Sequence, residues 1–147
     1  MKIRVLLVDD EKDFVDALAE RLSMRNYDVT VALRGEEALD KLRQYNFDVV
    51  ILDVRMPGID GNEVLSEIKR IKPLTEVIML TGHATVESAI EGMKQGAYDY
   101  LIKPCETEDL VTKINRAYEK KAEHEERIRE AKVKEIISSP RAALKDA

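Results

Sequence analysis

The sequence lacks several features that mark particular classes of protein. Its 147 residues include a single cysteine, Cys105, which excludes an internal disulfide and a zinc site built from cysteines. Apolar runs are short, and none approaches the ~18 residues of a membrane-spanning helix. The first residues, Met1–Arg4, do not begin a signal-peptide pattern. These absences predict a reduced, soluble protein of the cytoplasm, with no contact with a membrane.

An excess of positive charge is also missing. Lysine and arginine number 24 against 29 aspartate and glutamate residues, which gives a formal net charge of −5. Without an overall basic field, we expect no direct binding to nucleic acid. The segment Glu119–Glu135 holds six acidic and six basic residues, so the acidic excess belongs to the residues before it. A cation-binding site is therefore expected in that earlier part of the chain.

Short apolar segments alternate with helical stripes along most of the chain. Strands are expected at residues 3–8, 28–31, 49–52, 76–80 and 97–102, each followed by a helix. Such units imply parallel strands joined by right-handed crossovers, and strands that are apolar on both faces imply helices on both sides. We predict an α/β fold, a doubly wound, flavodoxin-like sheet of five parallel strands in the order 2-1-3-4-5. Five helices accompany it, the last one extended.

Chemically reactive side chains follow four of the predicted strands. Asp9 and Asp10 follow the first strand, Asp53 the third, Thr81 ends the fourth, and Lys103 follows the fifth. In the predicted order these strand ends share one edge of the sheet, which is where open parallel sheets bind ligands. Neighbouring carboxylates repel one another unless a cation intervenes, and Mg²⁺ prefers such oxygen ligands. The central Asp53 is then placed to attack a phosphoryl group, with Lys103 and Thr81 binding the phosphoryl oxygens.

Each of these residues alone has an ordinary structural explanation. An aspartate after a strand is usually a turn or helix-cap residue, and a single lysine is usually a solvated charge. It is the joint placement at four strand ends that indicates a site. The segment 53–61 adds to this, because it contains a Pro-Gly and an Asp-Gly turn signal. A tight loop there can bring the Arg55 carbonyl back toward a metal at Asp53.

Four motifs together resemble the receiver (response-regulator) domain of two-component signalling. They are VDDE at residues 8–11, DVRMPGIDG at 53–61, LTGH at 80–83, and Lys103-Pro104. The resemblance covers residues 2–118. Within it, residues 82–89 and 96–101 are most similar to receivers of sigma-54-dependent enhancer-binding activators. In those proteins an ATPase domain and a DNA-binding domain follow, and this sequence contains neither.

The resemblance implies a phosphorylation site. Asp53 is expected to accept a phosphoryl group from a sensor histidine kinase or a phosphotransfer protein, in a reaction that needs Mg²⁺ or, as a substitute, Mn²⁺. Asp10, Asp53 and the backbone carbonyl of Arg55 would hold the ion, with Asp9 acting mostly through water. Lys103 would pair with the phosphoryl group. Such a chain catalyses its own phosphotransfer and slow dephosphorylation, and it acts as a signalling switch.

The resemblance also implies how the switch responds. Thr81 and Tyr100 are expected to form a switch pair, in which the hydroxyl moves onto the phosphoryl group and the ring turns inward. The peptide bond before Pro104 is expected to be cis. His83 is expected to be a residue of the rim rather than a catalytic base, and Cys105 a small packed residue.

Two other classes that use similar sheets fit poorly. A haloacid-dehalogenase-type phosphatase carries D-x-D after its first strand, a spacing that Asp9-Asp10 lacks. A flavin-binding module needs a loop of serine, threonine and glycine there, whereas Asp9-Asp10-Glu11 would repel a phosphate. Two readings of a receiver stay open. The chain is either a stand-alone receiver or the receiver fragment of a larger transcription activator.

The last part of the sequence predicts a helix that continues beyond the domain. Residues 108–137 contain no glycine or proline, so the fifth helix is expected to extend roughly 45 Å and to end before Ser138-Ser139-Pro140, with a loose end after it. The chain thus divides into a receiver domain, residues 1–118, and a charged helical extension, 119–147. Because apolar residues are sparse there, the extension is expected to be solvated or to pair weakly with a second copy. The face formed by the fourth helix, fifth strand and fifth helix would then govern dimerisation.

Overall fold

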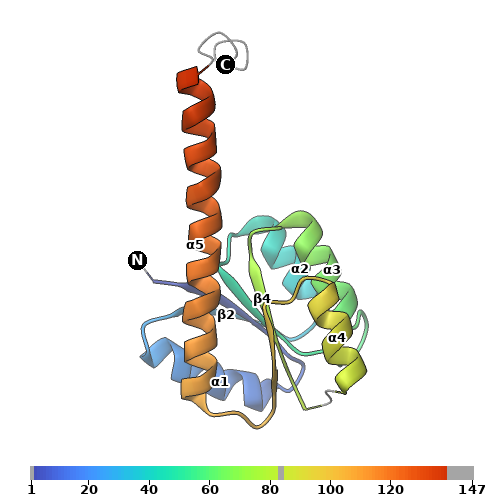
Figure 1. Ribbon diagram of the computed structural model, residues 1–147. Coiled ribbons are helices and arrows are strands. Elements are labelled where there is room, and N and C mark those ends of the chain that lie inside the picture. The colour runs from blue at the N-terminus through green and yellow to red at the C-terminus, as the bar shows by residue number, and fades with distance from the viewer. Residues whose placement is uncertain (1, 83–84, 139–147) are drawn as a thin grey trace.

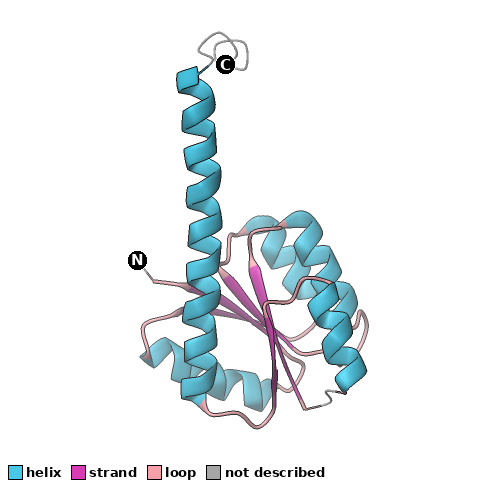
Figure 2. Ribbon diagram, in the orientation of Figure 1, coloured by secondary structure: helices cyan, strands magenta, loops and turns pink. Residues whose placement is uncertain are grey.

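A parallel β-sheet lies at the centre of the protein, covered by helices on both faces (Figures 1 and 2). The computed structural model describes residues 2–82 and 85–138. The strands are β1 Arg4–Val8, β2 Asp28–Ala32, β3 Val49–Leu52, β4 Glu76–Thr81 and β5 Asp99–Ile102. Their order is β2-β1-β3-β4-β5, and every neighbouring pair is parallel. The predicted sheet and its strand order are confirmed.

The helices lie in two layers on either side of the sheet. They are α1 Lys12–Met24, α2 Gly35–Gln44, α3 Gly61–Ile71, α4 Val86–Lys94 and α5 Thr107–Ser138. Buried side chains of α1 and α5 share one apolar cluster with the sheet, and those of α2 and α3 share the other. α4 lies beside α3, on the same side of the sheet (Figure 1). This is the doubly wound arrangement that the alternation of strands and helices predicted.

The central strands are buried because their apolar residues face both layers. In β1, Leu6 and Val8 belong to the cluster with α2 and α3, whereas Val5 and Leu7 belong to the cluster with α1 and α5. Successive side chains of a strand point to opposite faces, so an unbroken apolar run fills both cores. The same holds for β3 and β4, in which every residue is buried. The two cores fix the sheet and thereby fix where its strand ends lie.

The fifth strand begins at Asp99, two residues later than the sequence indicated. Gly96 adopts φ +103° after α4, and its N–H donates to the Met93 carbonyl at 3.2 Å. The Ala97 N–H donates to the Gly92 carbonyl at 3.0 Å. These two bonds form a Schellman ending for the helix, which takes up the residues that had been expected to open the strand.

A tight loop between β3 and α3 turns the chain back at the edge of the sheet. The Gly61 N–H donates to the Val54 carbonyl at 2.7 Å. A Cβ atom at Gly61 would lie 2.3 Å from the Asp53 carbonyl oxygen, so glycine alone permits this approach. Asp60 caps α3, since its side chain accepts from the Glu63 N–H at 3.0 Å. The loop is thus held against the residue that follows β3.

Helix α5 continues far past the sheet that it covers (Figure 1). Its buried side chains are Leu110, Ile114 and Ala117. Two ion pairs tie the next turn to the domain, Lys121 to Asp48 at 3.2 Å and Lys120 to Glu76 at 3.7 Å. The predicted long helix is confirmed. It includes Ser138, one residue more than expected, and the expected loose end lies outside the described residues.

No helix among the described residues is long and apolar enough to cross a membrane. The division of the chain at residue 118 stays a prediction. The two ion pairs made by Lys120 and Lys121 lie just beyond that point, so the domain and the start of the extension are in contact.

Candidate functional site

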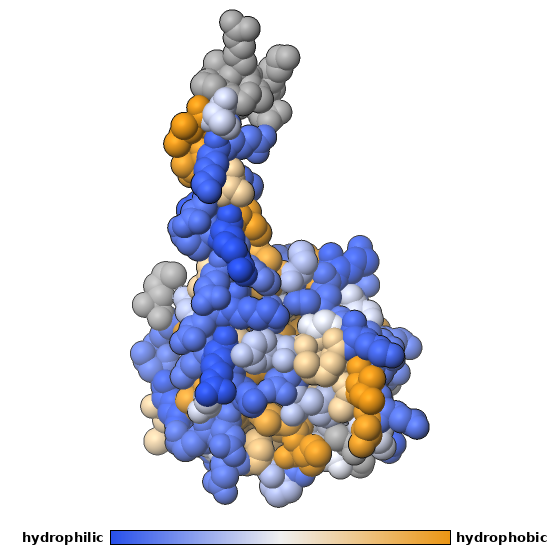
Figure 3. Space-filling model, viewed as in Figure 1, coloured by the Kyte–Doolittle hydropathy of each residue, from blue (hydrophilic) through white to orange (hydrophobic). Residues whose placement is uncertain are grey.

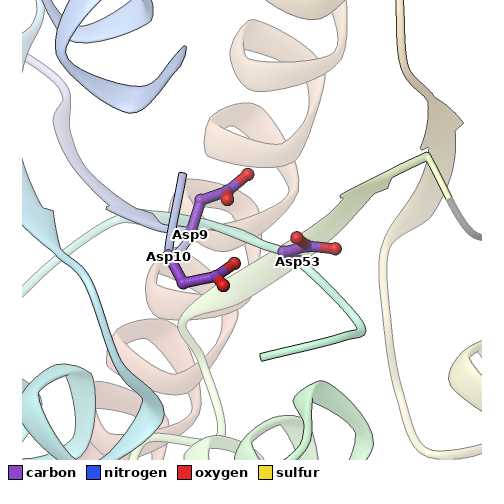
Figure 4. A group of neighbouring side chains, drawn as sticks. All are labelled: Asp9, Asp10 and Asp53. Atoms are coloured by element: carbon purple, nitrogen blue, oxygen red, sulfur yellow. The ribbon is translucent and has the colours of Figure 1, made fainter. Parts of the chain in front are cut away.

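Three carboxylates gather where β1 and β3 end (Figure 4). Asp9 and Asp10 follow β1, and Asp53 follows β3. The ladder continues one step past the strands, because the Asp53 N–H donates to the Val8 carbonyl at 3.0 Å. Ligand oxygens of the three aspartates all lie within 4.8 Å of one another. The structure therefore brings together the acidic cluster that the sequence predicted.

The aspartates differ in exposure. Asp9 is 4% exposed and Asp53 3% exposed, whereas Asp10 is exposed to solvent. Two of the three carboxylates are thus buried beside a third that is open to water. Burying ionised carboxylates is costly unless cations or hydrogen bonds offset it. This donor set, made of hard oxygen atoms, suits a small divalent cation such as Mg²⁺ or Mn²⁺.

Lys103, from the segment after β5, brings the predicted ammonium group to the cluster. Its Nζ lies 2.5 Å from Asp9, 3.5 Å from Glu11 and 3.7 Å from Asp53. Burial alone would lower the pKa of Lys103, but the hydrogen bond to Asp9 and the nearby carboxylates outweigh it and raise the pKa. The group therefore stays protonated. The bond from Lys103 to Pro104 is cis, as expected.

The buried Asp9 is held by two donors. Its side chain accepts from the Glu11 N–H at 2.9 Å and from the Lys103 ammonium. Burial raises the pKa of Asp9 and the charge of Asp53 adds to this, against the opposing effect of the two hydrogen bonds. Several negative groups thus share one ammonium, and the cluster keeps a negative balance that favours a further cation.

Arg55 lies two residues after Asp53 in the tight loop. Its N–H donates to the Asp53 carboxylate at 3.4 Å, which folds the loop toward that side chain. The role expected of its carbonyl, as a metal ligand, stays a prediction.

Thr81 and Tyr100 come from neighbouring strands. Thr81 ends β4 and is fully buried. Tyr100 in β5 is half-buried, and its hydroxyl lies 3.3 Å from the Ser88 hydroxyl in the first turn of α4. A Cβ at Gly92 would lie 3.5 Å from the Tyr100 ring, so the ring sits close against α4. The switch movement expected of this pair stays a prediction.

Three residues around the site make contacts that the sequence did not indicate. Glu11 and Phe14 both contact Lys103, the second through its ring. Phe14 lies on the apolar face of α1, and periodicity gives a face but not a contact partner. Ser88 forms a capping box with Thr85, and nothing in the sequence indicated its contact with the tyrosine.

Two residues near the site had been given minor roles. Cys105 is half-buried, and burial, followed by the charges of Asp109 and Glu106, raises the pKa of its thiol. A protonated thiol agrees with the expected packed residue. His83 lies outside the described residues, so its place at the rim stays a prediction.

Comparison with known proteins places this site in a family. Residues 5–115 match the response regulator receiver domain. The transcriptional regulatory protein ZraR of Escherichia coli K12 is 39% identical over 115 residues, which are 78% of this chain and 26% of ZraR. The chain thus spans about a quarter of the length of the curated relatives that it matches.

Solved structures show the same fold. A CheY-like response regulator receiver domain protein from Methanospirillum hungatei superposes with a TM-score of 0.81 at 28% identity, covering 84% of this chain and 99% of that one. NtrX from Brucella abortus superposes with a TM-score of 0.80 at 33% identity, covering 86% of this chain and 29% of NtrX. The resemblance inferred from the motifs is confirmed. This chain belongs to the response regulator receiver domain family.

Proposed function

We propose that the protein is a phosphorylatable receiver in which Asp53 accepts a phosphoryl group from a sensor histidine kinase or a phosphotransfer protein. The observation that carries this is the meeting of three carboxylates and one protonated lysine at the ends of β1, β3 and β5. A carboxylate oxygen of Asp53 forms a bond to phosphorus while the bond from phosphorus to the donor breaks. The product is an aspartyl phosphate.

The acidic cluster would hold the Mg²⁺ ion that this reaction needs. Asp10, Asp53 and the Arg55 carbonyl would bind it, with Asp9 acting mostly through water. The ion would supply positive charge to the phosphoryl oxygens. Lys103 would pair with the same oxygens, since its ammonium already lies 3.7 Å from the Asp53 carboxylate.

Phosphorylation of Asp53 would change the surface of the protein through movements of Thr81 and Tyr100. The Thr81 hydroxyl would move onto the phosphoryl group, and the Tyr100 ring would turn inward. In this structure the tyrosine hydroxyl is beside Ser88, so such a turn would change the contact between β5 and α4. A local change of charge would thus bias a two-state element.

The output would be altered partner binding or dimerisation through the face of α4, β5 and α5. Exposed apolar side chains on this face support it, namely Val86, Ile90, Met93 and Ile102. Figure 3 shows hydrophobic side chains gathered over α4. A stand-alone receiver in the cytoplasm would bind a separate protein with this face, or a second copy of itself.

A second candidate is the receiver part of a larger transcription activator. The length of the relatives favours it, because ZraR, a transcriptional regulatory protein, matches over 26% of its own length. The reading frame that follows the codon of Ala147 decides between the two.

Labelling with a small acyl phosphate tests the proposed function. The parent chain is expected to take one phosphoryl group in the presence of Mg²⁺ or Mn²⁺ and none in excess chelator. Asp53→Asn is expected to take none, while Asp40→Asn, which changes an exposed aspartate of α2, is expected to behave as the parent. Label that survives Asp53→Asn, or that forms equally in chelator, contradicts the proposal.

A further inference from the structure

The ammonium group of Lys103 contacts an aromatic ring as well as carboxylates. Its Nζ lies 4.2 Å from the centroid of the Phe14 ring. The Lys103 side chain is only 13% exposed, although its neighbours Asp9, Glu11 and Asp53 make the site strongly polar. The ring therefore accounts for part of the shielding of this charge from water.

A ring acts on an ammonium differently from a carboxylate. The ring face attracts a cation through its quadrupole, but it carries no net charge. A further carboxylate would attract the ammonium more strongly and would also neutralise more of its charge. Phe14 thus holds Lys103 in place and leaves its charge available for an anionic group. Shielding from water strengthens that charge's effect on such a group.

The position of the Phe14 ring is fixed by the same turn that orients Asp9. Phe14 lies in the first turn of α1, and its ring packs against the apolar cluster shared by α1 and α5. The Glu11 N–H donates to the Asp9 carboxylate, and the Glu11 carbonyl accepts from the Val15 N–H at 3.0 Å. The backbone of Glu11 thus links the Asp9 carboxylate to the first turn of α1, which carries the Phe14 ring.

We propose that Phe14 is a positioning residue for Lys103, holding its ammonium beside Asp53, where an oxygen of the transferred phosphoryl group would lie. This inference rests on the proposed phosphorylation of Asp53. Phe14 does not touch the phosphoryl group, and it acts only through the lysine. Without the ring, the ammonium keeps its pair with Asp9 but loses a contact that limits its movement away from Asp53, so phosphorylation slows.

Two substitutions at Phe14 distinguish the effect of the aromatic ring from the effect of side-chain volume. Phe14→Leu keeps an apolar side chain and loses the ring, whereas Phe14→Tyr keeps the ring face. With a small acyl phosphate and Mg²⁺, Phe14→Leu is expected to lower the maximal labelling rate roughly two- to tenfold, the range of one cation–π contact at a half-buried site. Phe14→Tyr is expected to restore the parent rate.

A spectroscopic measurement tests the contact without any phosphorylation. In the parent and in Phe14→Tyr, the ring is expected to shift the ε-methylene proton resonances of Lys103 upfield of the ordinary lysine position. In Phe14→Leu the resonances are expected to return to it. These spectra are recorded without Mg²⁺ or donor, and thermal unfolding confirms that each variant is folded.

The matched control is Phe47→Leu, the same change at the other phenylalanine of the chain. Phe47 is 5% exposed and lies before β3, at the opposite end of the sheet from Asp53. This variant is expected to be less stable than the parent, with an unchanged labelling rate and unchanged Lys103 resonances. Phe14→Met replaces Phe14→Leu if the latter does not fold.

The outcomes distinguish this inference from the function on which it rests. A parent that is labelled on Asp53, with Phe14→Leu labelled at the same rate, overturns the inference alone. Lys103 resonances at their ordinary position in the parent also overturn it. A parent that takes no label on Asp53 overturns the proposed function and the role of Phe14 with it.

Discussion

At the scale of single residues, the site is a balance of buried charges. Asp9 and Asp53 are nearly inaccessible to water, and the Lys103 ammonium pairs with both. Ionised carboxylates in such positions destabilise a fold unless a cation offsets them. The lysine that serves the proposed chemistry therefore also stabilises the folded chain before any metal or phosphoryl group is bound.

Replacing Lys103 by methionine is expected to lower the free energy of unfolding of the metal-free protein by roughly 2 kcal/mol at pH 7, because two buried carboxylates lose their cation. The folded-state pKa of Lys103 is raised, so its stabilisation is fully present below the unfolded-state pKa. It is lost as the pH rises through the folded-state pKa. Urea unfolding from pH 7 to 11 is expected to show a constant difference up to about pH 10, and a smaller one above it.

The control for this change is Lys132→Met, on the exposed part of α5, which is expected to leave stability unchanged. Equal stability of the parent and Lys103→Met at pH 7 would contradict the argument that the ammonium offsets the burial of the two carboxylates.

Gly61 gives a second prediction at this scale. Gly61→Ala places a Cβ 2.3 Å from the Asp53 carbonyl oxygen and 2.6 Å from the Val54 Cα, so the loop after β3 must move. We expect a loss of roughly 2–3 kcal/mol in the free energy of unfolding, together with weaker Mg²⁺ binding. Gly82→Ala is the control, since its nearest neighbour in the described residues would be 4.0 Å away, at Lys103. Similar losses for both variants would contradict the argument.

At the scale of elements, α5 links the domain to its extension. Lys120 and Lys121 reach the amino ends of two strands, where Glu76 opens β4 and Asp48 precedes β3. Both carboxylates are buried. These pairs lie at the opposite end of the sheet from Asp53, and they tie the start of the extension to the domain.

Lys121→Met is expected to loosen the start of the extension while the domain stays folded. The Lys121–Asp48 pair is nearly buried, with side chains 14% and 10% exposed, so its loss is expected to cost roughly 2 kcal/mol. Hydrogen exchange is expected to show several-fold lower protection of the amides of residues 119–125. Lys134→Met, farther along the exposed helix, serves as the control. Unchanged exchange in Lys121→Met would show that helix propensity alone determines the amide protection of residues 119–125.

The elements and the acidic cluster could be predicted because each has a local signal. Apolar runs define the strands, and the aspartates stand directly after two of them. The pairs of Lys120 and Lys121 had no such signal, because a charge run is also typical of a solvated helix. The ring of Phe14 beside Lys103 had none either, since the two residues meet only when α1 and the segment after β5 are both in place. Contacts between charges far apart in the sequence depend on the assembled fold.

At the scale of the whole molecule, the described residues expose two apolar areas away from the site. One is the α4 and β5 face, with Val86, Ile90, Met93 and Ile102. The other lies on the projecting end of α5, with Val133, Ile136 and Ile137. Each area is made of only a few apolar side chains, so each is expected to support only weak association. They lie on different elements, and only the first is close to the proposed switch residue Tyr100.

Sedimentation of the full chain, with and without beryllium fluoride as a phosphoryl mimic, is expected to assign a separate role to each area. The parent is expected to self-associate weakly and more strongly with the mimic. Ile90→Glu with Met93→Glu is expected to abolish the response to the mimic, because that face carries the switch. Ile136→Glu with Ile137→Glu is expected to weaken association equally in both states. Met24→Glu, an exposed methionine at the end of α1, is the control. If the response to the mimic persists in the α4 variant and is lost in the α5 variant, the output lies on the extension instead.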